Sequence, residues 1–250
     1  MNAIRRLLYE NGLALATLVL FAFSLTAQIG TGLAETNSDR SEHGEPGIAL
    51  GPYLTSGHFV EALFENWESE FLQMGAFVAL TIFLRQKGSP ESKPLEGEQP
   101  SDRDPDPRRP GAPWPVKRGG MILKLYQNSL SIVLFALFFF SLAMHAVGGA
   151  MEYNDEQAAH GSPERVTALS YLGTTRMWFE SFQNWQSEFM SVGALVVLGI
   201  VLRQKGSPEI EARRPSSRRN GERVALRRFG SFRSGRSSND LAGVLIGPEP

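Results

Sequence analysis

Two long apolar runs alternate with charged segments along the chain. The first, between Glu10 and Glu35, holds 24 residues without Asp, Glu, Lys or Arg, and the second, between Lys124 and Glu152, holds 27. A helix needs about 20 apolar residues to cross the hydrocarbon core of a bilayer, which is ~30 Å thick. A helix also satisfies its own backbone hydrogen bonds in lipid. Both runs therefore predict transmembrane helices.

Each long run is followed by a shorter one. Residues 71–84 and 189–202 are two stretches of 14 residues without a charge. As a helix, 14 residues span only ~21 Å. Extending each helix backward through the preceding polar residues supplies the missing length, and it draws Glu70 and Glu188 toward the membrane boundary or inside it. We therefore expect four transmembrane helices.

The chain also repeats itself. FENWESEFLQMGAFVALTIFLRQKGSPE at 64–91 and FQNWQSEFMSVGALVVLGIVLRQKGSPE at 182–209 are identical at 19 of 28 positions, and the stretch from Leu8 aligns without gaps to that from Leu125. The sequence predicts an all-α membrane protein with four transmembrane helices in two tandemly duplicated two-helix hairpins. Its expected parts are a first hairpin at 1–91, a Pro-rich cytoplasmic linker at 92–120, a second hairpin at 121–209 and a basic, disordered cytoplasmic tail at 210–250.

The first apolar run has a second interpretation, as a cleavable signal peptide. Arg5 and Arg6 precede it, and Gly-Leu-Ala lies directly before Glu35, as in secretory signals. Its aligned internal copy cannot be a signal peptide. We therefore expect the first run to be retained as a membrane span.

The basic residues predict the orientation. Lys and Arg number 2 before the first span, 9 from Arg85 to Lys124 and 11 after Leu202, whereas the two remaining segments hold only 3 of the 25. Basic residues gather on the cytoplasmic side of membrane proteins. We expect a multi-pass protein of the cell (inner) membrane with both termini and the linker in the cytoplasm. The expected partners are the lipid bilayer and anionic lipid, which the basic tail would bind. A second copy of the chain, in a homo-oligomer, is a further candidate partner.

Composition gives no sign of an enzyme. The chain has no Cys, and its net charge of -1 gives no general attraction for nucleic acid. The four histidines, at 43, 58, 145 and 160, form no spacing typical of metal ligands, so we expect no metal site and no cofactor. His145 lies near the outer end of its apolar run and aligns with Gln28, so we expect it at the membrane interface, outside any repeated site.

The duplicated stretch carries the candidate site. When it is read as a helix, apolar residues spaced by three and four form one stripe, and Asn66, Ser69 and Glu70 lie on another face. These polar residues recur in the second copy, whereas Glu65 and Glu68 align with glutamines and are ranked lower. The candidate residues for ion or proton binding, or for helix pairing, are Asn66, Ser69, Glu70, Asn184, Ser187 and Glu188.

Two interpretations of this site remain open. In the first, Asn and Ser hydrogen-bond between helices, and each Glu reaches water from the edge of the hydrocarbon. In the second, Glu70 and Glu188 face each other inside the bundle and bind a proton or a cation. Gly75 and Gly193 would permit close helix approach.

The flanks of the repeated helix predict membrane anchors. Tryptophan favours the membrane interface, and long cationic side chains reach the headgroups. Gly88 and Pro90 are expected to cap and break the helix. The predicted interfacial anchors are Trp67, Trp185, Arg85, Lys87, Arg203 and Lys205.

The motif F-x-N-W-x-S-E-F, followed by a short apolar run and LRQKGSPE, resembles a family of small bacterial integral membrane proteins catalogued only as a domain of unknown function. The resemblance covers both hairpins, and it implies no activity. From the sequence we expect a non-enzymatic membrane protein, structural or interaction-mediating, whose hairpins pair through the repeated helix. The alternative is a small proton or cation transporter or channel that uses Glu70 and Glu188.

Overall fold

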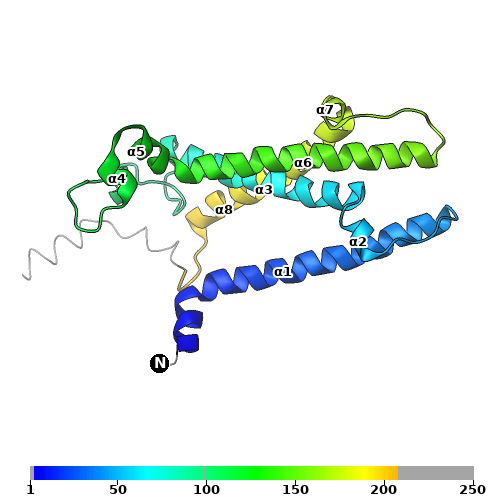
Figure 1. Cartoon of the computed structure of the whole chain (residues 1–250). Coiled ribbons are helices and arrows are strands. Elements are labelled where there is room, and N and C mark those ends of the chain that lie inside the picture. The colour runs from blue at the N-terminus through cyan, green and yellow to red at the C-terminus, as the bar shows by residue number, and fades with distance from the viewer. Residues whose placement is uncertain (1–2, 98, 208–250) are drawn as a thin grey trace, which may run out of the picture.

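The computed structural model describes residues 3–97 and 99–207, and this part of the chain is helical without any strand. Four long helices dominate it (Figure 1). In chain order the elements are α1 (Ala3–Glu42), α2 (Leu50–Tyr53), α3 (Gly57–Phe83), the 3-10 turn η1 (Pro100–Asp102), α4 (Trp114–Arg118), α5 (Gly120–Gln127), α6 (Ser129–Ala159), α7 (Ala168–Tyr171) and α8 (Thr175–Val201).

Three of the long helices are long and apolar enough to cross a membrane. They are α1 from Ile4, α6 and α8. The all-helical class is therefore confirmed, and three of the four expected spans have the required length and composition. The remaining long helix, α3, is not among them; it carries four glutamates, at 61, 65, 68 and 70.

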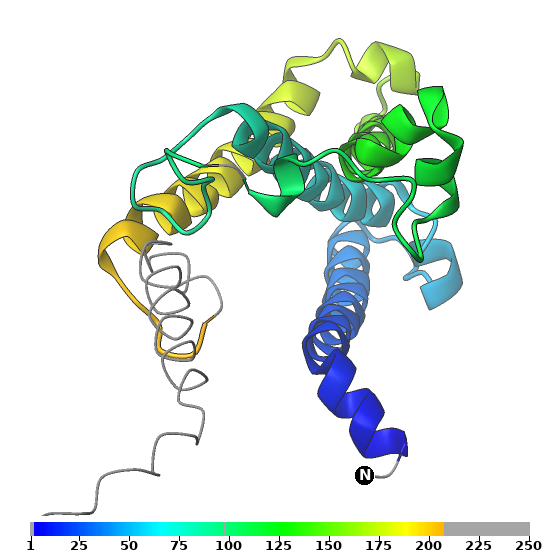
Figure 2. The same cartoon turned by 90° about the vertical axis from the view of Figure 1, so that its left-hand side faces the viewer.

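The helix α3, with its four glutamates, lies at the centre of the packing. It packs most extensively along α6 and to a smaller extent against α8, so that it lies between them (Figure 2). The helix α1 runs below α3 and contacts it through few residues, including Phe21 and Trp67, whose ring centroids are 6.3 Å apart. The main contact between the predicted halves is thus α3 with α6, and the contact between the two repeated helices, α3 and α8, is smaller.

Glycines bring α3 and α6 into backbone contact. A Cβ atom at Gly148 would overlap the backbone of Glu61, and one at Gly57 would overlap the backbone of Glu152. Small residues permit this kind of close approach between helices in lipid. Of the two glycines expected to do so, a Cβ atom at Gly75 would meet Phe135 of α6 at an ordinary 3.4 Å, whereas one at Gly193 would meet nothing within 4 Å.

The same local bend occurs near the start of both long runs. Asn11 interrupts α1 with a non-helical φ of −124° and ψ of 18°, and Asn128 separates α5 from α6 with φ −108° and ψ 9°. Each side chain donates to the carbonyl four residues earlier, at 3.1 Å for Leu7 and 2.8 Å for Lys124. An amide that bonds the preceding turn competes with the regular helix ladder, which explains the bend.

The connections that follow α1 and α6 also contain the same side-chain contact, in which one asparagine bonds the backbone of a residue further along the chain. Asn37 donates to the Ile48 carbonyl at 3.1 Å and accepts from the Ile48 N–H at 2.6 Å. Asn154 makes the same pair of bonds with Val166, at 2.9 Å and 2.8 Å. Each asparagine side chain therefore ties the returning chain to the end of the long helix, which helps to set where the next helix begins.

The helix ends differ from the sequence prediction. The helices α3 and α8 stop at Phe83 and Val201, and extended residues follow each of them. Gly88 lies five residues beyond the end of α3, in a turn with φ +86°, so it is not the cap that we predicted. The expected linker holds η1, α4 and the start of α5, and the expected tail at 210–250 lies outside the described residues.

Candidate polar cluster between α3, α6 and α8

The spacing of the glutamates on α3 creates the candidate site. Glu61, Glu65 and Glu68 are separated by four and three residues, so they share one helix face. That face is turned toward α6, α7 and α8. All three carboxylates find polar partners there, which is the condition for placing such groups inside a helix bundle.

The deepest contact of the cluster joins Glu68 to His145. Both side chains are fully buried, and the Nδ1 atom of His145 lies 2.8 Å from Glu68 Oε2. The indole N–H of Trp185 donates to the other carboxylate oxygen of Glu68 at 2.9 Å. Glu68 is therefore held by one partner on α6 and another on α8.

A second contact is centred on Tyr171, at the end of α7. Its hydroxyl lies 3.0 Å from Glu61 Oε1 and 3.0 Å from Glu180 Oε2. One hydroxyl carries a single hydrogen, so it donates to one of these carboxylates at a time. Burial raises the pKa of Tyr171, and the negative charges of Glu61 and Glu180 raise it further.

Arg176 closes the edge of the cluster. It donates to Glu180 Oε1 at 2.9 Å and to Glu156 Oε2 at 2.6 Å, which ties α8 to the end of α6. Asn184 donates to Glu65 Oε1 at 2.5 Å. Arg176 is the one permanent cation in contact with the cluster among the described residues.

One buried atom in this cluster has no hydrogen-bond partner. The Nε2 atom of His145 lies 3.5 Å from Glu180 Oε2, but it makes no hydrogen bond. The ligand atoms offered by Glu61, His145 and Glu180 all lie within 4.8 Å of one another. These three residues come from α3, α6 and α8, so tertiary packing alone brings them together.

The structure places the sequence-predicted residues around the cluster, and only Asn184 joins it. Asn66 and Glu70 are exposed, and Ser69 is buried but donates to the Asn66 carbonyl of its own helix at 2.8 Å. Ser187 is exposed and donates to the Asn184 carbonyl at 2.9 Å. Glu188 is half-buried, and it lies near enough to Glu70 for the two carboxylates to repel each other.

The predicted anchors divide between two environments. Arg85, Lys87, Arg203 and Lys205 are exposed just beyond the ends of α3 and α8, and Arg85 donates to the Ile82 carbonyl at 3.2 Å. Trp67 contacts the rings of Phe21, Phe64 and Phe71 on the outside of α3. Trp185 is half-buried and bonds Glu68, so it contributes to the interior contact as well.

The expectation for His145 was wrong. It was predicted at the membrane interface, and the structure buries it completely at the middle of α6. Sequence reasoning also missed Glu61, Glu68, Tyr171 and Glu180. One signal was present: His145 is the only His, Asp, Glu, Lys or Arg in its long apolar run, and an ionisable residue at such a position indicates a functional site.

A family model described as a domain of unknown function (DUF6766) matches residues 4–221. The chain belongs to the DUF6766 family. The resemblance noted in the sequence, to a family without an assigned activity, is thereby confirmed. No curated protein and no solved structure matches the chain. The description of the DUF6766 family names no activity.

Proposed function

We propose that the protein is a non-enzymatic integral membrane protein with a structural or interaction-mediating role. In this proposal α1, α3, α6 and α8 cross the cell membrane as two tandem hairpins, with both termini and the linker in the cytoplasm. The two hairpins are joined by buried polar contacts, and the outer faces of their helices meet lipid or other proteins.

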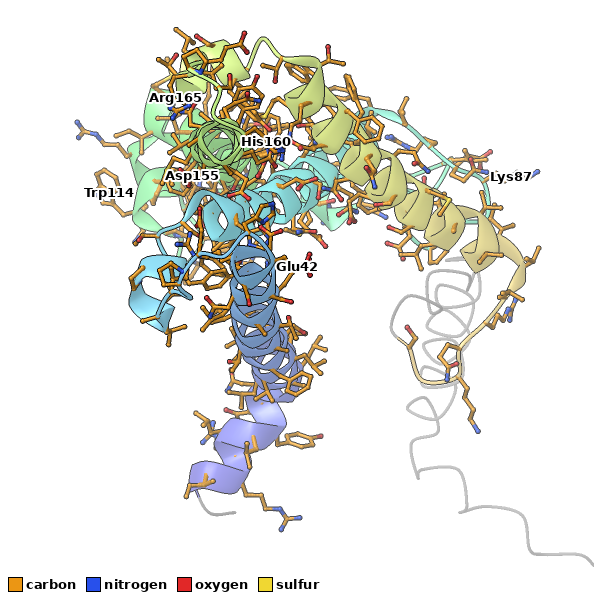
Figure 3. All side chains as sticks on the ribbon, turned by 90° about the vertical axis from the view of Figure 1, so that its right-hand side faces the viewer. Glu42, Lys87, Trp114, Asp155, His160 and Arg165 are labelled. Atoms are coloured by element: carbon orange, nitrogen blue, oxygen red, sulfur yellow. The ribbon has the colours of Figure 1, made fainter. Side chains whose placement is uncertain are left out.

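The distribution of apolar side chains supports a membrane location. No residue in the most apolar windows of α1 and α8 is fully buried within the molecule. A soluble monomer rarely exposes contiguous apolar patches larger than a few hundred Å². Lipid or protein must therefore cover these helices. The ends of α1 and α6, where Glu42, Asp155 and His160 lie, are on the same side of the molecule, as the two-hairpin arrangement requires (Figure 3).

The recurrence of local structure supports two related hairpins. The bends at Asn11 and Asn128 and the clamps at Asn37 and Asn154 both recur 117 residues apart. Helices α3 and α8 have 27 residues each. A sequence repeat that also repeats its side-chain contacts is what a tandem duplication produces.

The observation that carries the structural role is a set of four hydrogen bonds between the halves. They join Glu61 to Tyr171, Glu65 to Asn184, and Glu68 to both Trp185 and His145, across 110, 119, 117 and 77 residues of sequence. Polar side chains that bond across helices stabilise association in lipid, where the apolar faces have no preference for one another over lipid tails. The second half thus supplies the partners that allow the polar helix α3 to enter the membrane.

The proposal extends to partners. The basic tail and the cationic residues beyond α3 and α8 would bind the anionic inner leaflet, because each Lys or Arg near such a surface contributes about 1 kcal/mol. The exposed apolar faces of α1 and α8 offer contact surfaces to a second copy of the chain.

Cysteine labelling tests the topology, and the cysteine-free chain makes single-cysteine variants simple to read. A membrane-impermeant maleimide applied to intact spheroplasts is expected to label Gly44→Cys and His160→Cys. It is expected to leave Gly88→Cys and Ser207→Cys unlabelled until the membrane is permeabilised. Labelling of Gly88→Cys in intact spheroplasts would overturn the proposed arrangement.

A second candidate function is passage of a proton or a cation by way of Glu70 and Glu188. The observation in its favour is their proximity on α3 and α8, where the two carboxylates repel each other. A cation between them would remove this repulsion. Glu70 is exposed on the surface of the molecule, however, so this site would have to be completed by lipid or by a second copy.

A further inference from the structure

The buried imidazole of His145 presents a free lone pair. Its Nδ1 atom lies 2.8 Å from the Glu68 carboxylate, which is an acceptor, so Nδ1 carries the hydrogen. In the neutral ring, Nε2 is then an acceptor. It is fully buried and has no hydrogen-bond partner, and buried polar atoms in proteins are almost always satisfied.

This lone pair is aimed at carboxylates, which are themselves acceptors. Glu180 Oε2 lies 3.5 Å from Nε2, and a Glu61 oxygen completes a group within 4.8 Å. The Tyr171 hydroxyl offers one hydrogen to the two carboxylates, and no hydrogen bond reaches His145 Nε2. A metal cation is the species that accepts electron pairs from all three at once.

The distances suit a first-row transition metal. Zinc binds imidazole nitrogen at about 2.0–2.1 Å and carboxylate oxygen at about 2.0–2.2 Å, which puts neighbouring ligand atoms of a tetrahedral site roughly 3.4 Å apart. The separation of His145 Nε2 from Glu180 Oε2 already has this value. The Glu61 oxygen lies within 4.8 Å of the other two ligand atoms and would have to approach them by about 1 Å to complete the set.

The charges of the cluster favour the binding of a cation. The cluster holds four carboxylates, those of Glu61, Glu65, Glu68 and Glu180. Arg176 supplies one positive charge, and it pairs with Glu156 as well as with Glu180. Buried carboxylates without compensation are strongly unfavourable. A divalent cation would supply two positive charges at the point where these carboxylates are closest.

The surroundings of His145 match those of a metal-bound histidine. Such histidines commonly donate their second ring N–H to a carboxylate, which fixes the tautomer and the ring orientation. Glu68 is the carboxylate that accepts from the second ring N–H of His145. The indole N–H of Trp185 donates to the other oxygen of Glu68 at 2.9 Å and so fixes its orientation. Tyr171 donates toward the other two carboxylates and orients them.

We propose that Glu61, His145 and Glu180 bind one divalent transition-metal cation, with imidazole and carboxylate donors suited to Zn²⁺ or Mn²⁺, and that Glu68 is a positioning residue for His145. The site uses the packing of α3 against α6 and α8 on which the proposed function rests. The competing occupant is a proton on Nε2, which would make the ring an imidazolium that donates to Glu180.

The test is metal uptake by the full-length protein in detergent micelles. The protein is stripped with a chelator and titrated with Zn²⁺ by calorimetry, and with Co²⁺ as an absorbance probe. The parent is expected to take up one Zn²⁺ per chain and to show visible Co²⁺ bands of a site with nitrogen and oxygen ligands. Glu180→Gln is expected to lose stoichiometric uptake, and Glu68→Gln to weaken affinity by roughly 10–100-fold while keeping one site.

Glu42→Gln is the matched control, because Glu42 is exposed at the end of α1, outside the cluster. It is expected to bind Zn²⁺ as the parent does. Absence of uptake by the parent would overturn the metal site and favour the proton, and equal uptake by the parent and Glu180→Gln would overturn it by placing the metal elsewhere. The labelling pattern of the cysteine variants does not depend on metal, so failure of this proposal and failure of the proposed topology are distinguishable.

Discussion

A single methyl group at Gly148 tests whether α3 and α6 pack as closely as the structure shows. A Cβ atom there would lie 2.8 Å from the Cα atom of Glu61 and 2.9 Å from the carbonyl carbon of Val60. Carbon atoms pack best about 3.5–4.0 Å apart, so the helices would have to separate by roughly 1 Å. Backbone atoms lie on both sides, so no side-chain rotation relieves the overlap.

The net effect combines three contributions. Overpacking of this kind typically costs about 1–3 kcal/mol. Separation also weakens the bond between Glu61 and Tyr171, which contributes about 0.5–1.5 kcal/mol. Alanine is favoured over glycine inside a helix by about 1 kcal/mol, which offsets part of the loss. We expect Gly148→Ala to lower the free energy of unfolding by about 2 kcal/mol, or the melting temperature by roughly 4–8 °C.

Gly193→Ala is the matched control. Gly193 lies within α8, and a Cβ atom there meets nothing within 4 Å. This variant is expected to be unchanged or more stable by up to about 1 kcal/mol, through helix propensity alone. Thermal unfolding of both variants in the same detergent, followed by near-UV circular dichroism, measures the difference. Equal melting temperatures for the two variants would refute the close contact between α3 and α6.

Two further predictions concern hydroxyl and carboxyl groups. Tyr171→Phe removes the donor between Glu61 and Glu180 and is expected to lower stability by about 1–3 kcal/mol in the same unfolding assay. Tyr53→Phe is the control and should change stability little, because the Tyr53 hydroxyl makes no hydrogen bond to any described residue. Similar losses of stability in the Tyr171→Phe and Tyr53→Phe variants would count against the cluster. If Glu70 and Glu188 conduct, the double Gln variant is expected to abolish cation flux in proteoliposomes while still assembling, whereas Glu96→Gln in the linker retains it. Flux that persists in the double variant, or is absent from the parent, rules out this use of the pair.

The sequence was sufficient to predict the helical class and most of the long elements. The apolar runs correspond to α1, α6 and the second part of α8, because long uncharged stretches have few stable alternatives to a helix. The polar extension before residue 71 was also predicted, and it forms a continuous helix with the apolar part of α3.

The candidate site was not predictable to the same degree. Identity between the two copies ranked Glu70 and Glu188 first, but the cluster is not repeated: Glu68 aligns with a glutamine, and so does His145. Helical periodicity shows which residues share a face but not which helix that face will meet. The contact of His145 with Glu68 joins residues 77 apart in sequence, and it depends on close packing at Gly57 and Gly148.

The central position of α3 has a consequence for biogenesis. During synthesis Glu61 emerges 110 residues before Tyr171, which at 5–20 residues per second leaves it without this partner for roughly 5–20 s. Each unpartnered carboxylate costs about 2.5–3.5 kcal/mol at the centre of a membrane helix. A nascent α3 is therefore unfavourable in lipid by itself. In the proposed topology, its final insertion therefore waits until the ribosome has completed α6 and α8.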